Sequence, residues 1–261
     1  MVANKKYKIT IVGTGNVATH LAQAIFLSEH TLLQILSRNI ESAKNLAELL
    51  QAKGINNHKD LSPENDVVIL ALKDEALQNN YISQIPKNVI ICHTSGSIPM
   101  SILSSHQNHG IFYPLQTFSK QKKVDFSNIP ICLEASSKEV MNVLYHLANS
   151  ISQQVYEINS EQRKALHLTA VFACNFSNLM YNISEQLCEE SGIDFNILRP
   201  LIQETAAKVQ DHLPSEVQTG PAARNDQQII KEHLHLLNQH HDFQNIYKLL
   251  TDEIIRKNEE L

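Results

Sequence analysis

Residues 8–18, KITIVGTGNVA, decide the fold of this chain. Five residues of apolar strand character lead into a glycine turn, and an amphipathic helical pattern follows directly over residues 16–28. Gly13 permits the tight turn, Gly15 lets the backbone approach a ligand, and Ala18 stands where helix and strand must pack closely. The N-terminus of the helix offers free N–H groups and the positive end of its dipole. The stretch therefore predicts a site for the pyrophosphate of a dinucleotide.

The end of the second predicted strand, residues 36–39 (LSRN), indicates which dinucleotide binds. An Asp or Glu at this place bonds the ribose 2′-hydroxyl of NAD. Arg38 offers a guanidinium instead, which suits the 2′-phosphate of NADP, so the sequence predicts NADP. The alternative is that Arg38 is solvated and Glu41 binds the ribose. The residues expected to contact the cofactor are Gly13, Thr14, Gly15, Asn16, Val17, Ser37, Arg38, Asn39, Leu72, His93 and Ser95.

Alternating strand and helix patterns run through residues 1–159, and residues 160–261 show helical patterns alone. Alternation of this kind is typical of βαβ units and a parallel sheet. We therefore predict an α/β, Rossmann-type, doubly wound, mostly parallel sheet over 1–159, followed by a small all-helical domain over 160–261. The expected strands are 8–12, 32–37, 66–72, 88–93, 110–113, 129–133 and 154–157; the expected helices are 16–28, 40–50, 75–82, 138–150, 161–191, 195–212, 226–239 and 243–258.

Composition excludes several classes of partner. The net charge of −5 on 261 residues gives no basic footprint for nucleic acid. No apolar run is long enough for a membrane span, and no signal-peptide core precedes the first strand, so we expect a cytoplasmic protein. The four cysteines lack metal-ligand spacing, which predicts buried thiols and no metal site.

The helical pattern over 161–191 is apolar almost all round, which predicts a buried helix. At about 100° per residue, a polar stripe follows it, formed by Lys164, His167, Asn175, Asn178 and Asn182. Buried polar side chains need partners, so a stripe facing the sheet would form a substrate wall. Lys164 and His167 are then candidate general acids, and Asn175 and Asn178 would orient the substrate. The alternative is that Lys164 is solvated and the asparagines bond across a helical or subunit seam.

Three further segments contain polar side chains at predicted strand ends or turns: HTSGS at 93–97, YPLQTF at 113–118 and QTGPAARND at 218–226. His93 is either a proton donor or a hydrogen-bonded strand-end residue. Tyr113 and Gln116 either line a site or belong to a packed turn. Arg224 either binds an anionic group of the substrate or pairs with Asp226.

Together these three motifs resemble a bacterial family of Rossmann proteins with a helical C-terminal domain of unknown function, DUF2520. The resemblance covers essentially the whole chain, and the N-terminal half is also similar to coenzyme F420-dependent NADP oxidoreductases and pyrroline-5-carboxylate reductases. It implies an NADP-dependent oxidoreductase whose helical domain mediates dimerisation and closes the site. In the broader β-hydroxyacid dehydrogenase group a C-terminal helix carries a Lys and, one turn on, an Asn. Lys164 matches that Lys, but Leu168 occupies the Asn position.

The sequence thus predicts a homodimeric oxidoreductase that transfers a hydride between NADP and a small metabolite. The alternative is a non-catalytic NADP(H) sensor, whose sheet domain would look the same. Convergent titratable groups beside the nicotinamide distinguish the two, because only the enzyme needs them.

Overall fold

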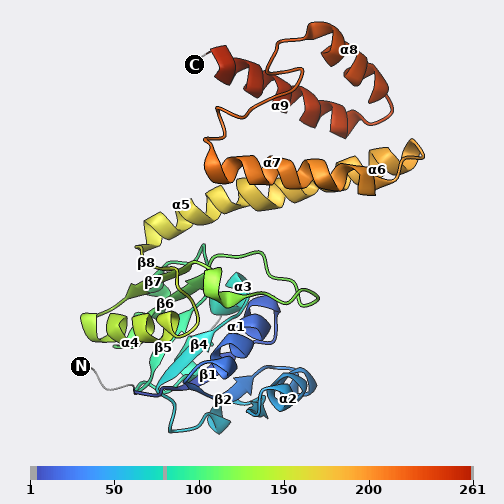
Figure 1. Cartoon of the computed structure of the whole chain (residues 1–261). Helices are drawn as coiled ribbons and strands as arrows, with labels where there is room; N and C mark the ends of the chain where they lie inside the picture. The colour runs from blue at the N-terminus through green and yellow to red at the C-terminus, as the bar shows by residue number, and fades with distance from the viewer. Residues whose placement is uncertain (1–4, 79–80, 260–261) are drawn as a thin grey trace. The chain divides into compact units, whose positions relative to one another are not determined.

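The computed structural model describes residues 5–78 and 81–259 (Figure 1). The chain divides into two compact units, Met1–Cys174 and Asn175–Leu261. The division falls further along the chain than the boundary placed from the sequence at 159/160. The reason is that the first turns of the helical region pack against the sheet, as the contacts of Arg163 and His167 described below demonstrate.

The first unit is built on an eight-stranded sheet with the strand order β3-β2-β1-β4-β5-β6-β7-β8. All neighbouring strands pair in parallel except β6 and β7, which pair antiparallel. The predicted doubly wound, mostly parallel sheet is confirmed. The strands are β1 (Lys8–Val12), β2 (Thr31–Leu36), β3 (Lys53–Ile55), β4 (Val67–Leu70), β5 (Ile90–His93), β6 (His109–Pro114), β7 (Ile131–Ala135) and β8 (Val155–Glu157).

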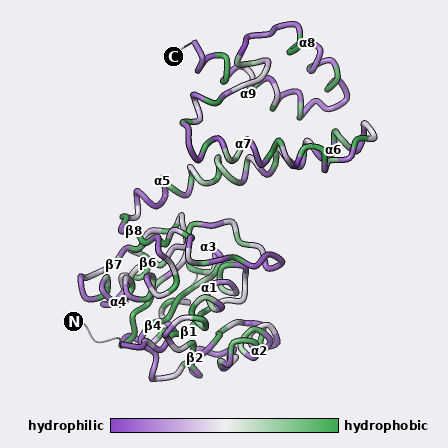
Figure 2. Tube along the Cα trace, viewed as in Figure 1, coloured by the Kyte–Doolittle hydropathy of each residue, from purple (hydrophilic) through white to green (hydrophobic). Residues whose placement is uncertain are grey.

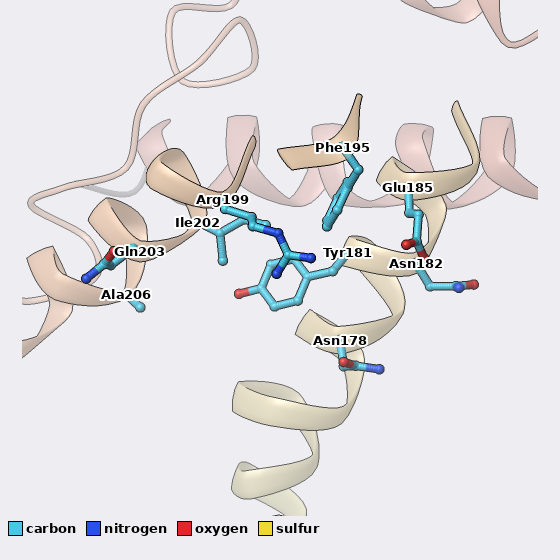
Figure 3. Close-up of a pocket in the computed structure, with 9 residues that line it drawn as sticks. All are labelled: Asn178, Tyr181, Asn182, Glu185, Phe195, Arg199, Ile202, Gln203 and Ala206. Atoms are coloured by element: carbon cyan, nitrogen blue, oxygen red, sulfur yellow. The ribbon is translucent and has the colours of Figure 1, made fainter. Parts of the chain in front are cut away.

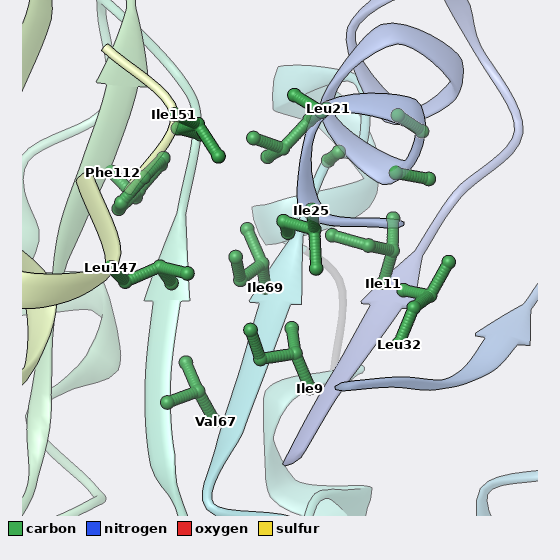
Figure 4. Packing of buried hydrophobic residues seen from close by; sticks show 14 of the residues in the cluster. Ile9, Ile11, Leu21, Ile25, Leu32, Val67, Ile69, Phe112, Leu147 and Ile151 are labelled. Carbon is green, nitrogen blue, oxygen red and sulfur yellow. The ribbon is translucent and has the colours of Figure 1, made fainter. Parts of the chain in front are cut away.

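Both faces of the central strands are buried, as a parallel sheet requires. Along β1, Ile9 and Ile11 point into one hydrophobic cluster and Val12 into the other. Figure 4 shows Ile11 beside Ile25 of the first helix, with Ile9 and Leu21 in the same cluster. Figure 2 shows that the central strands are largely hydrophobic. Helices α1 (Asn16–Leu27), α2 (Ile40–Leu49) and α4 (Lys138–Asn149) contribute to the first cluster, and α3 (Asp74–Gln78) contributes to the second.

Strand β3 and the helix expected over 75–82 differ from the sequence prediction. Strand β3 was missed because three residues are too short to show a period of two. The helix expected over 75–82 is a short α-helix followed by a 3-10 turn, Ile82–Gln84, and residues 79–80 of that range lie outside the described residues.

The helical region begins with one helical run, α5 (Ser160–Ala170), a π-helical stretch (Val171–Phe176) and α6 (Ser177–Glu190). The second unit continues with α7 (Arg199–Asp211), α8 (Gln227–Leu236) and α9 (His241–Glu259). The prediction that the first run is a buried helix is wrong for the single chain, because Leu168 and Leu179 are 58% and 45% exposed. An apolar helix pattern shows that the helix needs a packing partner, but it does not show whether that partner is another part of this chain or another molecule.

Two further expectations meet the structure here. In the described ranges, no helix combines the length and the hydropathy that crossing a membrane demands. Cys92 and Cys132 are buried as expected, but Cys174 is exposed and Cys188 is only partly buried, so the prediction of four buried thiols is half wrong. Both exceptions lie on the helical run whose apolar side chains are uncovered.

Candidate active site

The turn after β1 has a backbone that requires glycine. Gly13 has φ of 123°, and a Cβ atom there would lie 2.3 Å from the carbonyl oxygen of Ala71, just after β4. The Gly13 N–H donates to the carbonyl of Leu36 at 2.8 Å. The turn therefore holds the carboxyl ends of β1, β2 and β4 together, at the crevice where the strand order reverses.

The N-terminus of α1 is open to an anion. Gly15 is its N-cap residue, and a Cβ atom there would meet nothing within 4 Å. Within the described chain no side chain caps this end, and the first turn contains no acidic residue. Its N–H groups and the positive end of its dipole therefore fit a pyrophosphate.

A cavity of about 470 Å³ lies over the carboxyl ends of β1, β2 and β4. Six of the residues expected to contact the cofactor line it: Gly13, Thr14, Gly15, Ser37, Arg38 and Leu72. The sequence reasoning missed other residues on its wall, among them Lys73, Ala76, Tyr81 and Gln84. Lys73 could have been found, because it follows the β4 strand at the same edge of the sheet.

Polar groups gather where β2 meets the cavity. The hydroxyls of Thr14 and Ser37 lie 3.3 Å apart, and the exposed Arg38 follows Ser37 on the cavity wall. Burial raises the pKa of Tyr81, and the charge of Arg38 opposes that rise. Tyr81 is thus a neutral phenol near a guanidinium, a combination that fits a phosphorylated ribose.

Three other expected residues use their side chains to hold neighbouring segments. Asn16 Nδ2 donates to the carbonyl of Phe118 at 2.8 Å, and Val17 packs against the hydrophobic cluster. Asn39 caps α2 by accepting the N–H of Ser42 at 3.1 Å. These side chains do not line the cavity.

His93 and Ser95 are buried in the turn after β5. Ser95 Oγ accepts the backbone N–H groups of Ser97 at 3.1 Å and Ile98 at 3.0 Å, and His93 Nδ1 accepts that of Ser95 at 3.2 Å. Burial first, and then the charge of Arg163, lower the pKa of His93 to about 4. His93 is therefore neutral at neutral pH and holds the turn together.

The same turn lies against His167 of α5. A Cβ atom on Gly96 would lie 2.7 Å from Cγ and Nδ1 of the His167 ring. Tyr113, at the end of β6, places its hydroxyl 3.0 Å from His167 Nδ1. Because β6 runs parallel to β5, this pair lies at the same sheet edge as the glycine turn. The sequence analysis singled out Tyr113 and His167 separately but did not predict that they are in contact.

Arg163, which the sequence reasoning missed, anchors α5 to the sheet. Its side chain is fully buried; Nη1 donates to Glu134 Oε2 at 2.6 Å and Nη2 to the carbonyl of Ile98 at 2.6 Å. Ser160 Oγ donates to the same Glu134 oxygen at 2.7 Å. These bonds hold the α5 helix so that His167, four residues further on, contacts the turn after β5.

The remaining members of the polar stripe have surroundings of their own. Lys164 is exposed and pairs with Glu161 at 3.1 Å. Asn175 is exposed in the π-helical stretch. Asn178 and Asn182 line a second cavity of about 470 Å³ between α6 and α7 (Figure 3). The π-helical stretch alters the period between His167 and the asparagines, so the stripe drawn at a constant 100° per residue does not hold.

The turn before α8 has a structural explanation for one of its charges. Gly220 has φ of 110°. Asp226 caps α8 by accepting the N–H of Ile229 at 3.3 Å, and Arg224 is exposed. Asp226 therefore stabilises the start of α8.

One group in the described residues has metal-ligand composition: Glu29, His30 and His146, whose ligand atoms lie within 4.8 Å of one another. The N–H of Tyr7 donates to His30 Nδ1 at 3.3 Å, which leaves the proton of neutral His30 on Nε2. His146 Nε2 lies 3.2 Å from Glu29. Hydrogen bonds satisfy this cluster only in part, because His30 Nε2 is buried and has no hydrogen-bond partner among the described residues.

The fold and the glycine-turn cavity together define a Rossmann-type protein with a cavity that fits a dinucleotide. Residues 8–93 match the family described as NADP oxidoreductase, coenzyme F420-dependent, and residues 129–254 match the domain of unknown function DUF2520. A solved protein from Bacteroides fragilis, described as a putative NADP oxidoreductase, is 40% identical with a TM-score of 0.90, over 96% of this chain and 98% of that one. The chain belongs to the same family of NADP oxidoreductases as this Bacteroides fragilis protein. Its C-terminal half contains the DUF2520 region.

Two more distant structures share the fold. Pyrroline-5-carboxylate reductase from Streptococcus pyogenes is 17% identical with a TM-score of 0.69, over 98% of this chain and 99% of that chain. Reductive aminase from Aspergillus terreus, solved with NADPH and ethyl-5-oxohexanoate, is 13% identical with a TM-score of 0.69, over 97% and 95%. No similarity to a curated protein reaches significance.

Proposed function

We propose that this chain transfers a hydride between NADP and the carbonyl or imine carbon of a small metabolite. The observation that supports this most is a shared location: the glycine-turn cavity and the Tyr113–His167 pair lie at the carboxyl edge of one sheet. That edge is where doubly wound folds bind their ligands. The two reductases that share the fold act on compounds of this chemical class by name.

The cofactor part of the proposal uses the first cavity. Backbone N–H groups at Gly15 and the start of α1 hold the pyrophosphate, and Arg38 pairs with the 2′-phosphate. When bound, the nicotinamide supplies or accepts the hydride. His93 and Ser95 would act on the site only through the shape of the turn after β5, because their side chains are buried in it.

The proton part of the proposal uses His167. Addition of hydride to carbon moves the electron pair of the double bond onto oxygen or nitrogen, which then takes a proton. We assign that proton to His167 Nε2, because Nδ1 is bonded to Tyr113 and the ring is only half-buried. Lys164 and Asn175 are both exposed, so we assign them smaller roles. Lys164 supplies positive charge near the site, and Asn175 orients the substrate.

The proposal extends to assembly. We propose that the helical domain over 160–261 mediates a homodimer, because the long helical run leaves Leu168 and Leu179 exposed. A second copy would cover these apolar side chains and complete the substrate wall.

Consumption of NADPH in the presence of small carbonyl and imine compounds, including 1-pyrroline-5-carboxylate and ethyl 5-oxohexanoate, tests the proposal. We expect turnover with at least one member of the panel. His167→Ala should lower kcat by roughly 100-fold or more, the usual contribution of a general acid. Lys164→Ala, one turn away on the same helix, is the matched control and should change kcat only a few-fold. Full activity of His167→Ala would contradict the assignment of the proton donor.

A further inference from the structure

Tyr113 is a buried phenol whose hydroxyl reaches one acceptor. The side chain is 8% exposed and packs with Ile111 and Cys132. Its hydroxyl lies 3.0 Å from His167 Nδ1, and the two rings meet edge to face at 73°. Within the described residues this hydroxyl makes no other hydrogen bond, so its polar interaction there is with the imidazole alone.

The imidazole is held from a second side. The His167 ring lies against the backbone of Gly96, where even a methyl group would come within 2.7 Å of Cγ and Nδ1. The ring is therefore confined between Gly96 and Tyr113. Its Nε2 has no hydrogen-bond partner in the part of the chain that the structure describes, and it is the ring nitrogen left for a ligand.

The direction of the hydrogen bond follows from the chemistry of the two groups. Burial, with a smaller effect of Cys132, raises the pKa of Tyr113 to about 12, while the charge of Arg163 opposes the rise. The phenol therefore keeps its proton at neutral pH. An imidazole nitrogen is a better acceptor than a phenol oxygen, so the phenol donates and Nδ1 accepts. A neutral imidazole that accepts at Nδ1 carries its proton on Nε2.

We propose that Tyr113 is a positioning residue that sets the tautomer of His167, with the proton on the outward Nε2. This inference rests on the proposed function, in which His167 gives up that proton. When Nε2 delivers its proton to the substrate heteroatom, Nδ1 takes the phenol proton, so the imidazole stays neutral. The resulting phenolate is favoured by the positive charge of Arg163, and a hydronium ion from solvent restores the phenol, so that each reduction consumes one solvent proton.

Nitrogen-15 NMR of the histidine side chains tests the tautomer without any substrate. In the full-length protein at neutral pH we expect a pyridine-like shift for His167 Nδ1 and a pyrrole-like shift for Nε2, assigned by comparison with His167→Ala. Tyr113→Phe should convert this pattern into a mixture of tautomers. Tyr156→Phe is the matched control, because Tyr156 is an exposed tyrosine whose hydroxyl donates to Gln154, and it should leave the pattern unchanged. A protonated Nδ1 in the unaltered protein would overturn the proposal.

The pH profile of NADPH oxidation with 1-pyrroline-5-carboxylate gives a second readout. The charged and titratable groups that act on Tyr113 are Arg163 on α5 and Cys132 on β7, and Arg163 also acts on His93 of β5. Without the phenol proton, the imidazole needs a proton from solvent before it can donate, so the rate of Tyr113→Phe should rise as pH falls, while the rate of the unaltered protein stays flat. Parallel profiles would contradict the proposal. If the protein is inactive but shows the expected NMR pattern, the proposed oxidoreductase function is contradicted and the proposal about the His167 tautomer stands.

Discussion

A single added carbon atom would collide with a neighbour at two glycines of the candidate site. At Gly13 the obstacle is the carbonyl oxygen of Ala71, and at Gly96 it is the ring of His167. The first glycine sets the shape of the cofactor turn, and the second sets the place of the proposed proton donor. The first could be predicted from local sequence, because its motif is contiguous. The second could not, because His167 is far away in the chain.

Burial of His93 makes stability depend on pH. Its pKa is lowered to about 4, whereas the histidine of an unfolded chain titrates near 6.5. Between these values the unfolded state binds more protons, so the free energy of unfolding decreases as pH falls through this window. Between pH 6.5 and pH 5 the free energy of unfolding should fall in both proteins. We expect this fall to be smaller by about 2 kcal/mol in His93→Asn than in the unaltered protein.

Denaturant unfolding at both pH values measures this difference. The buried His30 and His106 also have lowered pKa values and add to the slope in both proteins, so only the difference between them is informative. The control His241→Asn alters an exposed histidine, so its free energy of unfolding should depend on pH as steeply as that of the unaltered protein. An unchanged slope in His93→Asn would show that His93 is not buried as a neutral imidazole.

At the scale of elements, hydrophobic periodicity predicted the sheet because each long strand is a buried apolar run between polar turns. It failed for the long helical run in two ways. The apolar pattern could not say whether this chain or another molecule covers the helix. The π-helical stretch Val171–Phe176 breaks the constant helical period on which the polar stripe depended. The Tyr113–His167 pair joins residues 54 positions apart, and no local pattern contains such a contact.

The attachment of α5 depends on the ion pair between Arg163 and Glu134. Removing the guanidinium leaves a carboxylate that is only 17% exposed without its partner, and such losses cost about 3–5 kcal/mol. Arg163→Met should therefore lower the free energy of unfolding by that amount in denaturant titration. Lys164→Met, which removes an exposed pair on the adjacent residue, should cost less than about 1 kcal/mol. Equal effects of the two changes would contradict the anchoring role.

At the scale of the whole molecule, the exposed apolar side chains of the helical run support the proposed homodimer. We expect sedimentation of the purified protein to give the mass of a dimer. Leu179→Glu should shift it toward the monomer, because a carboxylate would be buried without a partner. Leu49→Glu alters a leucine on α2 that is even more exposed than Leu179, and it should leave the dimer intact. A monomer at all concentrations, or a dimer indifferent to Leu179→Glu, would contradict this interface.

The central claim is that the cavity at β1, β2 and β4 binds NADP through the glycine turn and Arg38. Calorimetric titration with NADPH and NADH, for the unaltered protein and for Arg38→Ala, tests it most directly. We predict tighter binding of NADPH than of NADH, and a loss of roughly 10- to 100-fold for NADPH alone in Arg38→Ala, the worth of one charge-assisted hydrogen bond. Lys138→Ala, which removes one positive charge at the start of α4, should change neither affinity. Failure of both nucleotides to bind, or an NADPH affinity indifferent to Arg38→Ala, would contradict the account.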